Sequence, residues 1–437
     1  MKKITLFFIL IALSIMSYSQ TQTILHVNVN DMVYDSTRNK LFALIGSTDT
    51  QYGNNLIQIN CNTKLVEKNL FVGSNPELLE ITSDNNFLYI ALSGSPKIVK
   101  VDIAAFSIDL QFPIGPIGNS VNIYAEDIET IPGNSNLLAV SRKEGGYVED
   151  IVIFDNGVLL PDSVDSWDLE ATEIECDSTG KVLYGFNGSD TGFDFGRMDI
   201  GSTGVAYKDD FDGVMSGFNL KMYYINGLLY TNTGSIVNPH LSIPFNEGTF
   251  SGIESGSQLA LNIIEKESYF ATFDFWSEAF RVRRYDMETY TLKDIKEFDL
   301  IFPETMSDPE LSEFICFDND KFVVSAYESY FSEDNEKYIV FIDDVYSVTT
   351  SIANESNRMG KVLIYPNPVS EFLTVELDQN ITDYKIEIVN INGQIVYSVI
   401  SKGLNREEID VREYNSGIYL IRIFGGSDVI SQQLVIE

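Results

Sequence analysis

The sequence has few of the residues on which most enzyme sites depend. Its 3 cysteines, Cys61, Cys176 and Cys316, lie more than a hundred residues apart. A disulfide framework or a structural zinc site needs paired or closely spaced cysteines, so both are excluded. The 2 histidines, His26 and His240, leave little room for chemistry that needs imidazole pairs. We therefore expect three buried thiols and no catalytic cysteine or histidine.

Positive charge is also scarce. The chain carries 29 lysines and arginines against 64 aspartates and glutamates, which gives a net charge of −35. The electric field of so negative a chain repels polyphosphates, so nucleic acids and anionic membrane surfaces are poor partners. The G-x-S-x-G, H-E-x-x-H and phosphate-loop patterns do not occur. Because 44% of the residues are hydrophobic and 12% aromatic, the chain can nevertheless bury a core, and disorder throughout is excluded.

Long apolar runs are missing after the first segment of the chain. Lys2 and Lys3 precede an apolar run over residues 4–16, and Ser17 and Ser19 supply the small residues of a cleavage site. This layout predicts a signal peptide over residues 1–19 that is removed after Ser19. No later stretch approaches the eighteen or so apolar residues of a membrane-spanning helix. The mature chain is therefore expected to leave the cytoplasm and to carry no transmembrane segment.

A repeated unit fills residues 20–352. Each unit has an apolar strand after a polar residue, a polar turn, an aliphatic strand, a loop and a third strand such as NLIQIN or KIVKVD. Polar residues at the starts of the first strands recur at a mean spacing of 47 residues, which is the period of a propeller blade with four strands. The fold class predicted is all-β, with a seven-bladed β-propeller. The strand–turn–strand rhythm resembles that of the YVTN and quinoprotein-like propeller families.

A ring of blades has to be closed by one end of its chain. The segment 23–27, TILHV, is a spare strand, and we predict that it pairs into the last blade and so removes two exposed sheet edges. The segment 345–351, VYSVTTS, is the alternative closing strand.

The tail differs in kind from the repeats. After a polar linker over residues 353–361, residues 362–437 contain several strands joined by turns, which predicts a small antiparallel, immunoglobulin-like sandwich. Its landmark residues are Tyr365, Pro366, Asn367, Pro368, Asn392, Gly393, Gly417 and Tyr419. In their order the segment resembles the type A C-terminal sorting domain of the Bacteroidetes type IX secretion system. The resemblance implies handling by the type IX secretion machinery and delivery to the outer cell surface or to the medium.

The starts of the innermost strands carry an acid or an amide in every repeat. The expected positions are Asp31, Glu77, Asp127, Glu173, Asn219, Asn262 and Glu313. In a propeller these positions surround one mouth of the central channel, and crowded carboxylates raise one another's pKa unless a cation separates them. One interpretation is a cation site, with Ca²⁺ held by Asp31, Glu77, Asp127, Glu173 and Glu313. The alternative is that these groups cap strand ends in channel water.

Long loops that mix aromatic with acidic or amide residues are expected on the same face. Binding residues usually lie on such loops of a rigid scaffold. The candidates for stacking on a sugar or anchoring a protein are Tyr52, Tyr147, Phe193, Trp276 and Tyr330. The competing interpretation is that these rings pack between blades.

Together these features predict an exported, monomeric binding module for a glycan or an extracellular protein, with no assigned catalytic residue. The alternative is a secreted hydrolase or lactonase-like enzyme that uses the channel-mouth carboxylates with calcium. A purely structural role at the surface is a third possibility. Composition and spacing do not separate the three.

Overall fold

The chain divides into two compact units, one within residues 19–346 and the other within residues 347–437. The computed structural model describes residues 21–189, 191–274, 279–299, 309–318, 320–328, 337–346, 362–377, 383–390, 394–402, 405–425 and 428–436. The expected signal peptide and the linker over residues 353–361 lie outside these residues. The regular structure of the described residues is entirely β-strand, and none of it forms a helix able to cross a bilayer.

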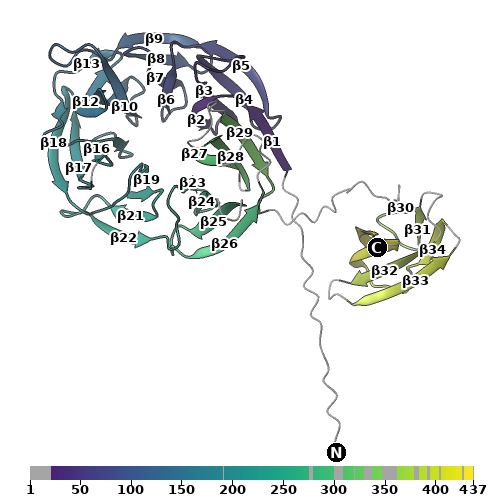
Figure 1. The fold of residues 1–437 in the computed structure, drawn as a ribbon. Helices are drawn as coiled ribbons and strands as arrows, with labels where there is room; N and C mark the ends of the chain where they lie inside the picture. Colours follow the sequence, from purple (N-terminus) through teal and green to yellow (C-terminus); the bar gives the residue numbers. More distant parts are fainter. Residues whose placement is uncertain are drawn as a thin grey trace, which may run out of the picture. The chain divides into compact units, whose positions relative to one another are not determined.

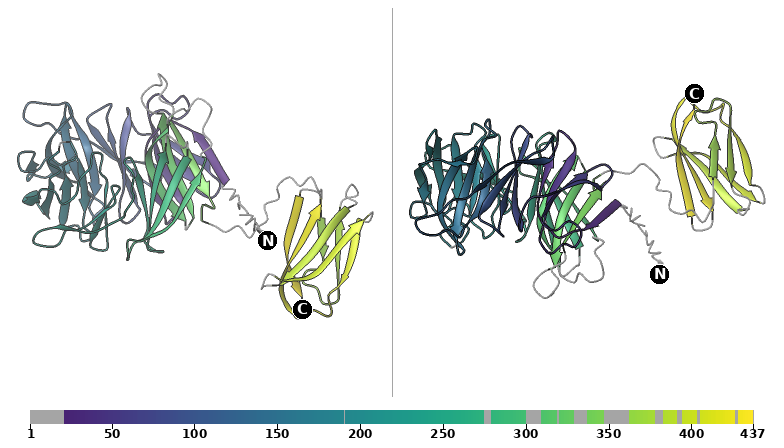
Figure 2. Two further views of the ribbon diagram at one scale, coloured as in Figure 1. Left: turned by 60° about the horizontal axis from the view of Figure 1, so that its bottom comes forward. Right: turned by 90° about the horizontal axis from the view of Figure 1, so that it is seen from above.

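The larger unit is a ring of antiparallel sheets (Figure 1). In the described residues, seven sheets follow one another along the chain, each with one strand at the centre and one at the rim. The turned views show the strands of each sheet running between the two faces of the ring (Figure 2). This arrangement is a β-propeller, the fold class expected from the repeat.

The strands of the ring fall into four groups by their position in the sheet. The innermost strands are β2 (Val29–Asp35), β6 (Pro76–Ile81), β10 (Ile123–Thr130), β15 (Glu173–Cys176), β19 (Met222–Ile225), β23 (Gln258–Asn262) and β27 (Pro309–Asp318). The second strands are β3 (Lys40–Ile45), β7 (Phe87–Leu92), β11 (Leu137–Glu144), β16 (Val182–Phe186), β20 (Leu228–Thr231), β24 (Glu267–Asp274) and β28 (Lys321–Glu328). The third strands are β4 (Asn55–Asn60), β8 (Lys97–Asp102), β12 (Tyr147–Asp155), β17 (Phe195–Gly201), β21 (Ser235–Asn238), β25 (Ala279–Asp286) and β29 (Lys337–Asp343). The rim strands are β5 (Leu65–Phe71), β9 (Ser107–Pro113), β13 (Val158–Leu159), β18 (Gly204–Phe211), β22 (Phe245–Thr249), β26 (Leu292–Phe298) and β1 (Thr21–His26), and β14 (Val164–Asp165) adds a short pairing to β12.

Apolar packing between neighbouring sheets holds the ring together. The second and third strands are short aliphatic runs, such as KLFALI in β3, that are buried on both faces. Seven hydrophobic clusters form in this way, and each combines residues of two sheets that are neighbours in the ring. One of them joins the first sheet to the last, since Val29 and Ile57 pack with Val323 and Phe341. Packing is therefore continuous around the ring.

The first strand of the chain closes the last sheet. β1 pairs antiparallel with β29, from Thr21 opposite Asp343 to His26 opposite Tyr338. His26 also stacks on Tyr338, with ring centroids 4.7 Å apart. This confirms the prediction that segment 23–27 closes the ring. Of the alternative segment, residues 345–346 form no strand and residues 347–351 lie outside the described part of the chain.

The smaller unit is a sandwich of two sheets. One sheet has the order β30 (Val362–Tyr365), β31 (Phe372–Leu377) and β34 (Arg406–Asp410). The other has the order β33 (Ile395–Lys402), β32 (Asp383–Asn390), β35 (Gly417–Gly425) and β36 (Asp428–Ile436). Its own buried cluster includes Val375, Ile386 and Ile423. The unit thus has a core that is separate from the ring.

Candidate functional site

Carboxylates on the innermost strands join neighbouring sheets. Asp31 accepts the Leu79 N–H at 2.6 Å, and Asp127 accepts the Ile174 N–H at 2.8 Å. Glu173 accepts the Met222 N–H at 3.1 Å. In each case the acceptor lies on one innermost strand, and the donor is the main chain of the next. These side chains therefore act as hydrogen-bonded links around the central channel.

A second layer of carboxylates lies two residues further along the same strands. Glu129 accepts the Cys176 N–H at 3.3 Å, and Glu175 accepts the Tyr224 N–H at 2.7 Å. Glu80 of β6 lies close enough to Glu175 and Glu129 for their charges to act on one another. Residues i and i+2 of a strand point to the same face, so the pairs Asp127/Glu129 and Glu173/Glu175 were the sequence signal for this layer. None of the ring positions expected from the sequence belongs to this layer.

The structure displaces three of the seven expected ring positions. Glu77 is exposed and lies at a bulge between Pro76 and Leu78, so that Leu78 takes the place corresponding to Asp31. Asn219 precedes β19, and Asn262 is the last residue of β23. A bulge adds a residue to one strand, and Glu77 is that added residue in β6 as Asn30 is in β2; spacing along the sequence does not distinguish the added residue from its neighbour.

The fifth sheet carries a lysine where the fourth sheet carries an acid. Lys221 directly precedes buried Met222, as Glu173 precedes buried Ile174. Its Nζ lies 3.1 Å from Glu173 Oε2. The charge of Glu173 raises the pKa of Lys221, so the lysine stays protonated. It is the one lysine or arginine among the described residues that line the channel cavity.

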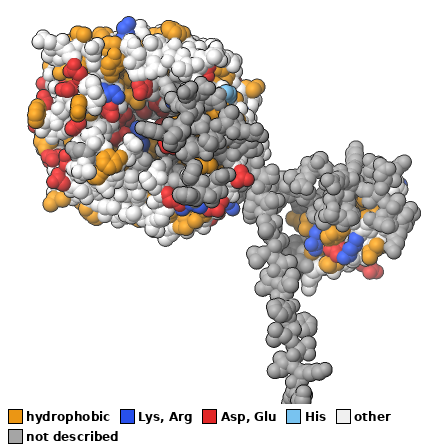
Figure 3. Space-filling model, viewed as in Figure 1, with side chains coloured by type: hydrophobic (Ala, Val, Ile, Leu, Met, Phe, Trp, Pro, Cys, Tyr) orange, Lys and Arg blue, Asp and Glu red, His pale blue; other side chains and the backbone are white. Residues whose placement is uncertain are grey.

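The channel cavity of about 520 Å³ is strongly acidic (Figure 3). Burial raises the pKa of Asp31 to about 6 and that of Asp127, Glu175 and Glu313 to about 8. Burial and then neighbouring carboxylates raise the pKa of Glu80 and Glu129 well above the usual range. Carboxyl groups that cannot all ionise together share protons near neutral pH.

The calcium expectation gains no support from this geometry. Among the described residues, no group of three or more histidine, cysteine, aspartate or glutamate side chains is arranged to hold a metal ion. Asp31, Asp127 and Glu173 each accept a hydrogen bond from a main-chain N–H group. These bonds occupy carboxylate oxygens that a calcium ion would need. Calcium binding by Asp31, Glu77, Asp127, Glu173 and Glu313 stays a prediction that a titration can test.

The loop aromatics lie in different surroundings. Tyr52 is half-buried, and its hydroxyl accepts the Gln51 side-chain amide at 2.9 Å. Tyr147 begins β12 and is 74% exposed. Phe193 stacks on Phe186 and meets Phe218 edge to face at 5.2 Å. Trp276 and Tyr330 lie outside the described residues.

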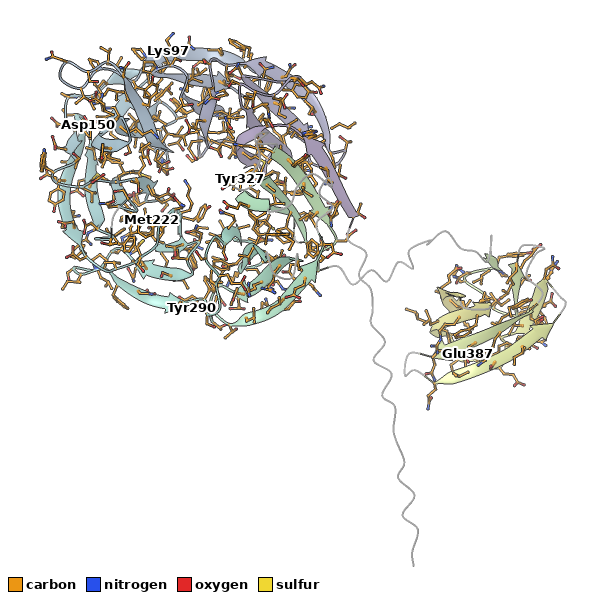
Figure 4. The ribbon with its side chains drawn as sticks, in the orientation of Figure 1. Lys97, Asp150, Met222, Tyr290, Tyr327 and Glu387 are labelled. Carbon is orange, nitrogen blue, oxygen red and sulfur yellow. The ribbon has the colours of Figure 1, made fainter. Side chains whose placement is uncertain are left out.

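A second cavity, of about 960 Å³, opens between the last three sheets of the ring. Three aromatic residues line it, namely Phe218, Phe273 and Tyr327. Phe218 is 59% exposed, so its ring is available to a ligand. Lys221 lines this cavity as well as the channel, so the two spaces meet at that residue. Figure 4 labels Met222, which follows Lys221, and Tyr327 on the opposite side of the channel.

The acidic groups in the wall of this cavity have hydrogen-bonding partners. Glu254 binds Arg281 Nη1 at 2.8 Å and also contacts Arg283 Nη2. The Tyr327 hydroxyl donates to Glu310 at 2.6 Å. Apart from Lys221, the remaining polar lining consists of amides and hydroxyls, among them Asn219, Ser255 and Ser312. The wall therefore offers aromatic faces and mostly neutral hydrogen-bonding groups.

The cysteines and histidines lie away from both cavities, with one exception. Cys61 and Cys176 are buried as expected, while Cys316 is half-buried and lines the channel. Cys61 lies in the turn after β4 and not in a strand. Burial raises the pKa of the Cys316 thiol to about 12, which keeps the thiol protonated and poorly nucleophilic.

Comparison with known proteins assigns the smaller unit. A family model described as a secretion system C-terminal sorting domain matches residues 363–437. These residues are a type IX sorting domain. A domain of this kind implies export by the type IX machinery, followed by attachment to the cell surface or release. The larger unit is thus the exported cargo.

The other similarities to known proteins are more distant and say less about this chain. Over 88 residues, 20% of the chain, it is 27% identical to ulvan lyase NLR42 of Nonlabens ulvanivorans, and the match spans 16% of that protein. Hydrazine synthase of Kuenenia stuttgartiensis aligns with a TM-score of 0.51 and 14% identity over 74% of this chain and 97% of its own. The β-propeller domain of Cps50 (Swd1) from Myceliophteria thermophila aligns with a TM-score of 0.52 and 12% identity over 73% of this chain and 99% of its own. At such identities the structural likeness shows the propeller fold alone.

In the sorting domain the segment 365–369 is hydrogen-bonded to the last strand. Asn367 Oδ1 accepts the Val435 N–H at 2.9 Å, and the Val369 N–H donates to the Val435 carbonyl at 2.9 Å. Tyr365 donates its hydroxyl to Glu376, and Tyr419 donates to the Asn415 carbonyl. Pro366 and Pro368 flank Asn367, and Gly417 begins β35. Asn392 and Gly393 lie outside the described residues.

Proposed function

We propose that the protein is an exported binding module whose propeller takes a glycan in the cavity lined by Phe218, Phe273 and Tyr327. The observation that carries the proposal is that cavity, about 960 Å³ in volume. Binding pockets for small ligands have volumes of roughly 300–1,000 Å³ and combine apolar walls with a few placed polar groups. The sorting domain supplies the route by which such a site meets extracellular ligands.

The chemistry of the wall favours a neutral polyhydroxyl ligand. Aromatic rings stack on the apolar face of a sugar, while amides and hydroxyls bond to its hydroxyl groups. Glu254 is ion-paired with Arg281, and Glu310 accepts the hydroxyl of Tyr327, so both carboxylates already have hydrogen-bonding partners. The net charge of −35 opposes anionic polysaccharides at long range. A neutral glycan segment satisfies these conditions.

The loop aromatics enter the proposal in different ways. Phe193 supports the cavity from behind, because its ring packs against Phe218. Tyr147 is a separate exposed ring and would extend a long ligand. Tyr52 is engaged with Gln51 and is a weaker candidate. An extracellular protein ligand remains the second outcome to be tested on this face.

The hydrolase alternative is less well supported. Its required groups are two carboxylates about 5–10 Å apart that are free to act on substrate. The channel carboxylates Asp31, Asp127 and Glu173 instead accept main-chain N–H groups of the next sheet. We therefore favour binding without turnover.

A glycan array with the purified mature chain tests the proposal. Phe218→Ala should weaken a neutral-glycan hit at least tenfold, since the ring provides the stacking surface. Phe71→Ala is the matched control, because Phe71 is similarly exposed, at 64%, on a rim strand. No hit on the array, or equal loss in both variants, would contradict the proposed site. Release of shorter sugars would indicate a hydrolase.

A further inference from the structure

An exposed tryptophan stands between the third and fourth sheets of the ring. Trp167 is 95% exposed, more than any other large hydrophobic residue of the described chain. It follows β14, which pairs with β12 so that Asp165 lies opposite Asp150. Asp150 is labelled in Figure 4 and locates this part of the ring. Neither cavity described above includes Trp167.

The turn that presents this ring is held firmly. Asp165 Oδ1 accepts the Trp167 N–H at 3.0 Å, and its carbonyl accepts the N–H groups of Asp168 and Leu169 at 3.0 and 3.1 Å. Val164 and Leu169 on either side are buried. The side chain is therefore displayed to solvent from a fixed backbone, which lowers the entropy lost on binding. We refer to residues 164–169 as the Trp167 turn.

The chain around the Trp167 turn carries charge of one sign. Residues 144–180 contain 11 aspartates and glutamates and no lysine, arginine or histidine. Asp150 is neutralised by Arg142, whose guanidinium Nε lies 2.7 Å from its Oδ1. Within the part of the chain that the structure describes, no basic side chain pairs with Asp162, Asp165 or Asp168 in this way.

Tyr207 of the next rim strand, β18, faces the same region. Its hydroxyl donates to Asp210, and that bond together with the nearby charge of Asp168 raises the pKa of Tyr207. Tyr207 is 39% exposed. The surface thus combines two aromatic rings with several carboxylates that lack a counter-charge.

We propose that the Trp167 turn docks a basic segment of a partner protein. A guanidinium or ammonium group gains from the negative face of the indole, and tryptophan is the best of the aromatic residues for this contact. Asp165 and Asp168 on either side add charge-assisted hydrogen bonds. An exposed tryptophan on a rigid backbone is the type of residue that carries most of the energy of a protein interface. A neutral sugar would stack on the indole ring of Trp167 but would gain no electrostatic attraction from the carboxylates that lack a counter-charge.

Binding of a fluorescent hexa-arginine peptide to the purified mature chain tests this inference. At 150 mM salt, Trp167→Ala should weaken binding about tenfold, and Asp168→Asn should weaken it less. Phe71→Ala is the control, because it removes an exposed ring elsewhere and leaves the charge unchanged. A melting curve for each variant checks folding, and Asp168→Asn decides the result if Trp167→Ala fails to fold.

Three results would overturn the inference. The first is a wild-type chain that does not bind hexa-arginine at 150 mM salt. The second is an equal affinity of wild type and Trp167→Ala for the peptide, which would mean that the peptide binds through the overall negative charge of the chain and not at the Trp167 turn. The third is a change of tryptophan emission that neutral oligosaccharides cause, that the peptide does not cause and that is lost in Trp167→Ala; this result would make the turn a sugar site.

Discussion

Raising the pH should destabilise the propeller through its channel carboxyls. The pKa of Asp127, Glu175 and Glu313 is about 8 in the folded chain, because they are buried, against an ordinary value of about 4. A carboxyl group with a higher pKa in the folded than in the unfolded chain contributes to the free energy of unfolding, and this contribution is fully present below about pH 4. That contribution is lost as the pH rises through about 8, because the unfolded chain releases the proton more readily.

The magnitude follows from the size of the pKa shift. One pKa unit corresponds to about 1.4 kcal/mol, so a shift of three to four units in a single group gives about 4–5 kcal/mol. Since the groups share protons and their effects are not additive, we take one group as the expected scale. At roughly 2 °C per kcal/mol for a unit of this size, Tm should fall by about 8–10 °C between pH 5 and pH 9.

Thermal melting of the mature chain, followed by circular dichroism between pH 5 and pH 9, measures this fall. Glu175→Gln is the test variant, because its amide oxygen can still accept the Tyr224 N–H but the side chain no longer ionises. The variant should have a shallower slope and a higher Tm at pH 9 than wild type. Glu288→Gln, at an exposed rim turn, controls for net charge. A wild-type Tm that rises with pH, or equal slopes in Glu175→Gln and wild type, would refute the reasoning.

Three further predictions concern other contacts. Gly204→Ala should cost about 2–3 kcal/mol of stability in urea unfolding, because a Cβ there would meet the Asp162 carbonyl oxygen at 2.0 Å; a loss below about 0.5 kcal/mol would contradict it. Asn367→Ala should cost the sorting domain about 1 kcal/mol and reduce export, since the Val435 N–H loses its acceptor; unchanged export in a secretion assay would argue against a role for this link. If the channel binds calcium as the sequence pattern suggests, 5 mM calcium should raise Tm in wild type but not in an Asp127→Asn/Glu173→Gln variant, and an unchanged wild-type Tm would remove that interpretation.

The fold was largely predictable from the sequence because its signals are local and repeated. Strands such as NLIQIN and KIVKVD were read within a residue of β4 and β8, since short aliphatic runs between polar turns have few alternatives. The spare strand at residues 23–27 was identified as the closing strand because an open ring would leave sheet edges unpaired.

The candidate site was much less predictable. The bulged residue is Asn30 in β2 and Glu77 in β6, so Leu78 and not Glu77 occupies the ring position of the second sheet. Lys221 was overlooked because an acid or amide was expected in each repeat. The cavity beside Phe218 depends on residues of three sheets that are brought together only by ring closure, and no spacing along the chain reveals such a space.

Ring closure also links the completeness of the cargo to its export. The pairing of Thr21 with Asp343 joins the first and last strands of the propeller, and the sorting domain follows the last strand in the chain. A polypeptide broken off anywhere within the ring therefore lacks both the partner of its first strand and its export signal. Because synthesis runs from the N-terminus, each chain that carries the sorting domain also contains both strands that close the ring.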